Sequence, residues 1–480
     1  MRQSKFIDLL AQLTERERSR FRDLSWSPFF NKNQKLRQLI GFCLEKAPGF
    51  IESELDKTVA FRLIYGAEQP YNELQINNLL SDALQLLQQM LTYQELEQEP
   101  ALLRAYETRA LLNRRAEKQL PHSLRRLRQL TERMSTRSHE YFHQQVEQNQ
   151  LQDRYALLQS TRRQSPHLQR ASDALDLYYC CHKMRLACDM ASRNRAINAQ
   201  YECHYITEVL SWYQEAGEKW KTYPALQTYY QALMMLTSEE EGYYKGLRQS
   251  LAAHGAIFSA EEQQDLYDYA QNYCVKRINS GDANYYQDIL ELYKLMLDQG
   301  VLLRQGYLTQ WSYINIVTAG IRLKEYDWTD WFIHAYRERL APEVQENVFT
   351  YNLVALQFGK SDYLGALQIL QGVEFSDAFY HMSAKIIQIK SYYELGEDEA
   401  LLSLLEASRK YIKRNRQLSA YQKQSNSHFL RMIGKIHKLQ ASRERVSRKA
   451  FEEAAKQLRR ELESLSPLTN KSWLREKLQV

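Results

Sequence analysis

The 480-residue chain has little glycine, proline or cysteine. It contains 16 Gly, 9 Pro and 6 Cys, so both turn-forming residues fall below their usual shares of about 7% and about 5%. This scarcity excludes the many tight turns that a β-sandwich or a doubly wound sheet needs. The residues that replace them, chiefly Leu, Gln, Glu, Arg and Ala, favour helix. We therefore predict an all-α protein.

Long apolar segments are also missing. The N-terminal residues lead into a charged amphipathic helix rather than the uninterrupted apolar core of a signal peptide, and no later run has the length needed to cross a bilayer. The cysteines are sparse for this length and fall within helical patterns, where buried thiols act as small hydrophobes. These features predict a soluble, cytoplasmic protein.

Two stretches near the C-terminus share one layout. Residues 353–370 and 387–405 each have an apolar helix, a tight turn and a second apolar helix, with an aromatic residue before the turn and an Ala after it. A small residue at that place lets paired helices approach closely. The turn at Tyr326 precedes the turn at Tyr363 by 37 residues, close to the period of about 34 of a tetratricopeptide array. The layout predicts a helical repeat, and such repeats usually bind rather than react.

The order of these patterns along the chain divides it into four predicted parts. Residues 1–98 form an N-terminal helical head, and residues 99–167 form long basic, Gln-rich helices. Residues 168–408 form a right-handed α-solenoid of helix pairs, tetratricopeptide-like, and residues 409–480 form a basic helical cap. The 33 Tyr of the chain fit such an array, because a buried ring can still place its hydroxyl at water or at a carbonyl.

Local signals fix several helix ends in the head. Thr14 and Glu17 have the spacing of a capping box, which predicts a helix that starts after Thr14. Ser27-Pro28 should end that helix, and Asn31 or Asn33 should cap the next one.

The net charge of +6 conceals a polarised distribution. Residues 409–480 contain 19 Lys and Arg against 6 Asp and Glu, a net charge of +13, and residues 104–170 carry +8. The remainder is therefore acidic. Such basic segments attract nucleic acid or, alternatively, are solvated or contact the acidic part of the chain. The most basic surface is predicted at Arg443, Arg445, Arg448 and Lys449.

The segment His139-Glu140-Tyr141-Phe142-His143 fits the H-E-x-x-H pattern of zinc peptidases, in which two imidazoles hold zinc and Glu140 activates water. Its flanks are polar, and no third ligand stands at a motif-like place. We therefore predict a solvated helix face with chance His spacing, and keep a zinc peptidase as the second alternative. The sequence contains neither a local nucleophile motif nor a Gly-rich phosphate loop. We predict no enzyme activity, no metal site and no cofactor.

The concave groove of the predicted array supplies the partner-binding hypothesis. Asn315 and Asn352 occupy equivalent positions relative to the two Tyr turns, and Trp311, Arg322 and Tyr351 lie on nearby turns. Paired Asn side chains can hold the backbone of an extended peptide, because each offers a donor and an acceptor. The alternative is that both amides bond within the array itself.

Over about its last three hundred residues the chain resembles tetratricopeptide-like repeat proteins. More closely, it resembles a family of uncharacterised bacterial helical-repeat proteins. The matching motifs are Ser27-Pro28-Phe29-Phe30-Asn31-Lys32-Asn33, Ala174-Leu175-Asp176-Leu177-Tyr178-Tyr179, Leu186-Ala187-Cys188, Asn272-Tyr273-Cys274 and Tyr326-Asp327-Trp328. The resemblance implies a helical-repeat fold and no particular activity. We expect a non-catalytic scaffold that binds a peptide or protein in its groove, with nucleic-acid binding by residues 104–170 and 409–480 as the first alternative.

Overall fold

The computed structural model describes residues 1–159, 164–197, 199–304 and 306–478. Residues 160–163 of the predicted basic segment, residues 198 and 305 of the predicted solenoid and residues 479–480 of the predicted cap lie outside the described residues. Within the described ranges there are twenty-four α-helices and three short 3₁₀ turns, and β-type pairing is limited to two isolated bridges. The all-α prediction is confirmed.

The chain divides into two compact units, Met1–His182 and Lys183–Val480. The boundary falls inside the long helix α9 (Pro166–Ile197). Each unit has its own core and is described by itself. None of the helices in the described part of the chain combines the length and the apolar character that a membrane crossing requires.

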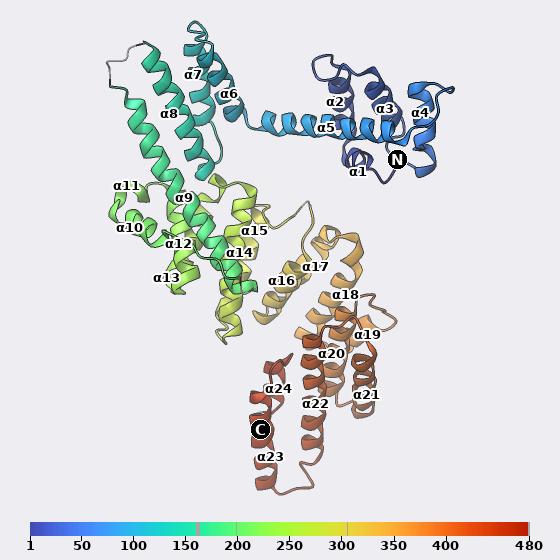
Figure 1. Cartoon of the computed structure of the whole chain (residues 1–480). Coiled ribbons are helices and arrows are strands. Elements are labelled where there is room, and N and C mark those ends of the chain that lie inside the picture. The colour runs from blue at the N-terminus through green and yellow to red at the C-terminus, as the bar shows by residue number, and fades with distance from the viewer. Residues whose placement is uncertain (160–163, 198, 305, 479–480) are drawn as a thin grey trace. The chain divides into compact units, whose positions relative to one another are not determined.

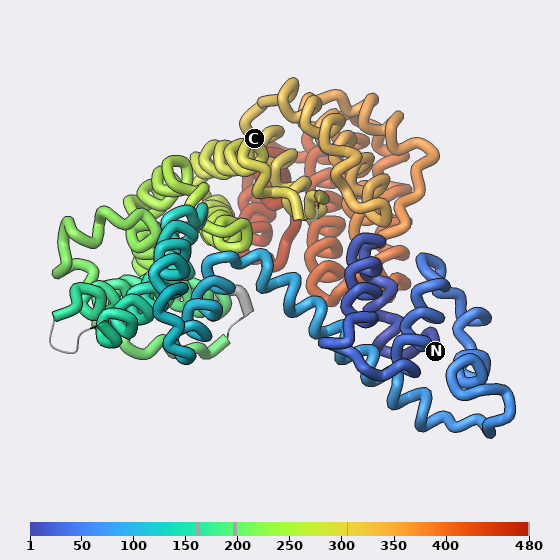
Figure 2. The backbone as a smooth tube through the Cα atoms, turned by 90° about the horizontal axis from the view of Figure 1, so that it is seen from above, coloured from blue at the N-terminus to red at the C-terminus, as the bar shows by residue number. Residues whose placement is uncertain are grey.

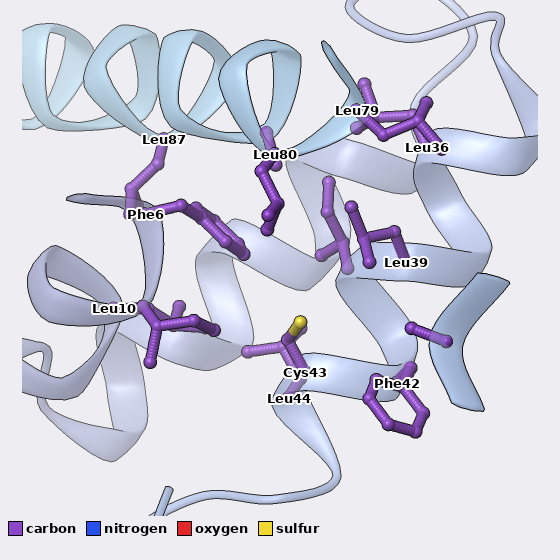
Figure 3. Packing of buried hydrophobic residues seen from close by; sticks show 14 of the residues in the cluster. Phe6, Leu10, Leu36, Leu39, Phe42, Cys43, Leu44, Leu79, Leu80 and Leu87 are labelled. Atoms are coloured by element: carbon purple, nitrogen blue, oxygen red, sulfur yellow. The ribbon is translucent and has the colours of Figure 1, made fainter. Parts of the chain in front are cut away.

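The head of the first unit is a small helical core. Helices α1 to α4 pack against α5, and a short 3₁₀ turn, η1, lies between α3 and α4. Their bounds are α1 Lys5–Gln12, α2 Glu15–Trp26, α3 Gln34–Leu44, η1 Glu52–Glu54, α4 Lys57–Tyr65 and α5 Glu73–Gln98. Figure 3 shows Phe6, Leu10 and Leu39 facing Leu80 and Leu87 of α5, and all five side chains are buried.

The predicted helix signals in the head are confirmed. Thr14 Oγ1 accepts from the Glu17 amide over 3.3 Å, and the Glu17 carboxylate accepts from the Thr14 amide over 2.7 Å, so both halves of the capping box form at α2. The same helix ends at Ser27, before Pro28. The Asn33 side chain accepts from two amides at the start of α3.

The rest of the first unit contains α6 (Pro100–Asn113), α7 (Leu120–Glu132), α8 (His139–Gln159) and the beginning of α9. Helices α6, α7 and α8 contact one another. They share a core that includes Leu112, Leu124 and Leu151, and Thr108 and Ser123 are hydrogen bonded inside it over 2.8 Å. The Leu side chains of these Gln- and Arg-rich helices pack together in this core. Each helix therefore buries its apolar face and exposes its polar face.

The second unit begins with the end of α9, α10 (Ile206–Glu215) and the single-turn α11 (Glu218–Lys221), and then forms helical hairpins. The hairpins are α12 Pro224–Ser238 with α13 Glu241–His254, α14 Ala260–Asn279 with α15 Tyr285–Asp298, α16 Gln310–Arg322 with α17 Tyr326–Ala335, α18 Pro342–Gly359 with α19 Tyr363–Leu370, and α20 Ala378–Leu395 with α21 Asp398–Arg414. Two 3₁₀ turns, η2 (Gly255–Ile257) and η3 (Arg337–Arg339), follow α13 and α17. Figure 2 follows this succession from green to red along the backbone.

Successive hairpins contact one another through the second helix of one and the first helix of the next, and in three places also through their first helices. Besides the contacts inside each pair, α12 contacts α14, α16 contacts α18, and α18 contacts α20. In the last three hairpins the first helices α16, α18 and α20 therefore lie next to one another on the same side of the stack.

One close approach explains a departure from the repeat pattern. Thr329 stands where a small residue is expected after Tyr326, and it is fully buried, with its hydroxyl donating to Glu325 O over 2.7 Å. Its partner on α16 is Gly320, where an added Cβ would overlap the Thr329 hydroxyl. The space that Ala provides in other repeats is here provided by the glycine of the facing helix.

The C-terminal part contains α22 (Ala420–Ala441), α23 (Arg448–Ser464) and α24 (Lys471–Lys477). The predicted apolar stripe is buried, with Phe429, Ile433 and Ile436 on α22 and Phe451 on α23 in one core. The short α24 contacts both α22 and α23, and its Trp473 joins that core.

Candidate functional site

A cavity of the second unit has a volume of about 670 Å³. Side chains of the first helices α16, α18 and α20 line it together with side chains of α22 and α24, and Tyr326 of α17 and Tyr363 of α19 also belong to the wall. These helices are labelled in Figure 1. We call it the repeat cavity. Its volume falls within the range of about 300 to 1,000 Å³ that is typical of ligand sites.

Much of the wall of the repeat cavity is aromatic. Seven aromatic residues line it: Tyr326, Tyr351, Phe358, Tyr363, Phe379, Tyr421 and Trp473. Tyr351 and Phe379 are only half-buried and offer ring surface to an incoming molecule. Burial raises the pKa of the Tyr351 phenol, which therefore stays neutral at physiological pH.

Lys390 of α20 is the central polar group of the repeat cavity. It is 9% exposed, and its Nζ lies 4.1 Å from the ring centre of Phe358 and 5.5 Å from that of Trp473. The ammonium donates to Asn470 Oδ1 over 3.3 Å. Burial, and to a smaller extent the positive charge of Arg322, lowers the pKa of Lys390 to about 8.

The carboxylate of Glu394, one helical turn after Lys390, is held by α24. Trp473 Nε1 donates to Glu394 Oε1 over 2.8 Å, and Lys477 Nζ donates to Glu394 Oε2 over 2.7 Å. These two bonds attach the C-terminal helix to the last hairpin. They also satisfy the acidic side chain that lies nearest to Lys390 along its own helix.

The charged residues of the repeat cavity are mainly cationic. Four of the six are basic: Arg322, Lys324, Lys390 and Lys477, against Glu394 and Glu476. Arg322 and Lys324 are exposed. The cavity therefore favours an anionic ligand.

The structure brings together only some of the predicted groove residues. Tyr351 and Arg322 line the repeat cavity. Trp311 is 55% exposed, packs edge-on against Phe379 with ring centres 5.5 Å apart, and lines a neighbouring cavity of about 310 Å³.

The predicted pairing of Asn315 with Asn352 is not found. Asn315 is exposed, and its amide nitrogen lies 3.4 Å from the Tyr293 hydroxyl. Asn352 is 1% exposed, and its amide nitrogen donates to Val348 O over 2.7 Å within α18. Both bonds lie within the array, which is the alternative considered for this pair, and Asn352 faces the core of the stack because its position on α18 lies one residue away from the cavity-lining Tyr351.

Four important cavity residues were not predicted from the sequence: Phe358, Lys390, Glu394 and Trp473. One signal could have found Lys390. It follows Ile386 by four residues and Ile387 by three, which places a lysine on an otherwise apolar helical face. A buried charge is costly unless it is paired, so such a lysine is an indication of function.

The H-E-x-x-H segment is not a solvated face throughout, which corrects the sequence-based interpretation. His139, the first residue of α8, is 7% exposed, and its ring centre lies 4.5 Å from that of His182 on α9. His143 is exposed beside Tyr178, with ring centres 5.0 Å apart. Among the described residues, no group of three or more His, Cys, Asp or Glu side chains is arranged to hold a metal ion.

The predicted basic surface lies at the turn between α22 and α23 and at the start of α23. Arg443, Arg445, Arg448 and Lys449 are all exposed. Arg448 pairs with Glu452 over 3.0 Å, and the Arg443 guanidinium lies 5.8 Å from the Phe451 ring centre. This surface is available to solvent and to a polyanion.

A second group of titratable residues lies where α9 meets α14. Tyr269 donates to the Asp189 carboxylate, and Arg185 lies 3.8 Å from Asp265. Burial, and to a smaller extent the negative charge of Asp189, raises the pKa of Asp265 to about 6. This group connects two helices of the stack and responds to mildly acidic pH.

Comparison of the chain with protein-family models, curated proteins and solved structures finds no match. The functional argument is therefore made from the geometry and chemistry of the repeat cavity.

Proposed function

We propose that the chain is a non-catalytic, cytoplasmic scaffold that binds a peptide segment of a partner protein in the repeat cavity. In this proposal residues 168–408 form a right-handed, tetratricopeptide-like α-solenoid between the N-terminal parts and the basic cap. The contacts between successive first helices support it, because repeats that touch only their neighbours build the concave surfaces that solenoids use for binding.

The observation that carries the proposal is the lining of the repeat cavity. First helices of three consecutive hairpins contribute to one cavity of about 670 Å³, with half-buried aromatic rings and a few convergent charged groups. Apolar walls supply affinity and convergent polar groups fix orientation, which is the usual composition of a recognition site. A peptide provides apolar side chains for the rings and charges for the lysines.

Nucleic-acid binding is the alternative, and the exposed Arg443, Arg445 and Lys449 favour it. Phosphate contacts weaken steeply with salt, because each contact releases counterions. Two results together would favour this alternative over the scaffold. The chain would select no peptide, and its retention on nucleic acid would fall steeply between low and moderate salt.

The test introduces a bulky side chain into the repeat cavity and measures whether the chain still selects peptides. Ser383 of α20 is half-buried in the cavity wall, and Ser403 of α21 is exposed. A random peptide library is selected on the immobilised wild-type chain, on Ser383→Trp and on the matched control Ser403→Trp, with helical circular dichroism confirming the fold of each.

The scaffold proposal expects peptides selected by the wild type and by Ser403→Trp, and few or none by Ser383→Trp. Equal selection by all three chains would place the peptide site elsewhere. No selection by the wild type would contradict peptide binding altogether.

A further inference from the structure

Among the described residues, no carboxylate forms an ion pair with the Lys390 ammonium, and the charges of Glu394 and Glu476 offset only part of the effect of burial on its pKa. The described residues give its ammonium one acceptor, Asn470 Oδ1, at the long distance of 3.3 Å, and two ring faces. A lysine ammonium has three N–H donors. At least part of its hydrogen-bonding capacity is therefore open to a molecule in the repeat cavity.

Leaving a buried ammonium in this condition is energetically unfavourable. A charge removed from water costs several kcal/mol unless a partner of opposite sign and good geometry offsets it. The ring faces of Phe358 and Trp473 offset only part of that cost, because a cation–π contact is weaker than a desolvated ion pair. A carboxylate in contact with Nζ would offset much more.

The chain contains a carboxylate close enough in sequence, but its bonds are directed elsewhere. Glu394 accepts from Trp473 and from Lys477. Glu394 therefore forms no ion pair with Lys390, and neither does Glu476, the other carboxylate of the cavity wall, although the charges of both raise the pKa of Lys390. Arg322 and Lys324 at the exposed part of the wall add two more positive charges, and no ion pair with a described residue neutralises either of them.

We infer that the repeat cavity recognises a peptide carboxylate, which binds the Lys390 ammonium while adjacent apolar side chains of the peptide contact the rings of Tyr351 and Phe379. The inference rests on the proposed peptide-binding function and specifies its ligand class. The carboxylate has two sources in a peptide, an Asp or Glu side chain or a free C-terminus. Both offer the same acceptor oxygens to Nζ.

Three pools of hexapeptides test the inference and separate the sources. The first pool is acetylated and amidated, with Glu fixed at the third position and the other five positions random. The second is identical with Gln in place of Glu. The third has Gln and a free C-terminal carboxylate. Each pool is passed over the immobilised full chain, and retained peptides are quantified by mass spectrometry.

We expect the Glu pool or the free-terminus pool to be retained about tenfold or more above the amidated Gln pool, since a charge-assisted bond contributes about 1.5 to 3 kcal/mol. The pool that shows the gain identifies the source of the carboxylate. Lys390→Met and Lys390→Gln should both remove the gain. Lys413→Met, which changes an exposed lysine of α21 outside the cavity, should keep it.

Equal retention of all three pools by the wild type would overturn the carboxylate inference and leave the peptide scaffold standing. A carboxylate gain that survives in both Lys390 variants would also overturn it, because another cation would then bind the ligand. Retention of none of the pools would contradict the inference and the proposed function together.

Discussion

Trp473 and Glu394 are joined by a hydrogen bond between residues 79 positions apart, with Trp473 Nε1 donating to Glu394 Oε1 over 2.8 Å. The bond attaches α24 to the last hairpin and commits the Glu394 carboxylate to the C-terminal helix. Lys390, one turn earlier on α20, is left facing aromatic rings and the repeat cavity. This arrangement links the stability of the cap to the chemistry of the proposed site.

Lys390→Met should raise the free energy of unfolding at pH 7. The variant removes a buried charge whose pKa is lowered from 10.5 to about 8, and it keeps an unbranched side chain of similar length. The expected gain is about 1 to 3 kcal/mol, measured by urea unfolding. A variant less stable than the wild type would show that the ring contacts outweigh the cost of burial.

The same lysine predicts the sign of a pH effect. Above pH 8 the native state has lost the proton that the unfolded chain keeps up to about pH 10.5, so the wild type should gain stability as the pH rises through this window. The groups that face Lys390 are Arg322, Glu394, Glu476 and Lys477. The difference in unfolding free energy between wild type and Lys390→Met should therefore be smaller near about pH 9.5 than near neutral pH. A constant difference between them would contradict the lowered pKa.

Asp265 predicts a pH effect of opposite sign at acidic pH. Its pKa is raised from 3.8 to about 6, so the native state keeps a proton that the unfolded chain loses, and stability should fall as the pH rises from about 4 to about 6. Asp265→Asn should therefore have a higher melting temperature than the wild type at pH 7 and a similar one near pH 4. The control is Asp298→Asn, which changes an exposed carboxyl. Equal effects of the two variants would contradict the prediction.

Gly320→Ala should destabilise the hairpin of α16 and α17 by about 1 to 3 kcal/mol, because its Cβ would overlap the buried Thr329 hydroxyl. The double variant Gly320→Ala with Thr329→Ala should recover part of the loss, since the second change removes the overlapping atom. A thermal unfolding cycle of the four chains measures the coupling. Strictly additive effects would mean that the two helices do not depend on this contact.

Reversal of Arg443, Arg445, Arg448 and Lys449 to Glu should leave the melting temperature nearly unchanged, because all four side chains are exposed. Peptide selection by the repeat cavity should also persist, while any retention on heparin should fall. Loss of peptide selection in a folded variant would move the binding site to the basic surface and contradict the scaffold proposal.

The sequence predicted the fold class and local helix ends well, because both depend on near neighbours. The capping box of Thr14 and Glu17 and the helix end at Ser27 require only a few residues each. Burial of the stripe through Phe429 and Ile433 follows from helical spacing alone.

Contacts between distant segments were less accessible to sequence reasoning. Whether Asn352 faces a groove or the core depends on the rotation of α18 against its neighbours, and a difference of one position reverses the answer. His139 was expected on a polar face because its flanks are polar, yet α9 covers it with His182. The meeting of Lys390 with Trp473 joins residues more than eighty positions apart and has no local signal beyond a lysine on an apolar face.

Photo-crosslinking tests the central claim most directly. A hexapeptide selected by the wild-type chain is made with benzoylphenylalanine at one apolar position, irradiated on the full chain, and the labelled residue is located by mass spectrometry. The account predicts labelling at the cavity wall, with Met382 of α20 and the neighbouring Tyr351 or Phe379 as the main sites, and loss of labelling in Ser383→Trp. Labelling concentrated on α21, which does not line the cavity, or at residues 443–449 would contradict it.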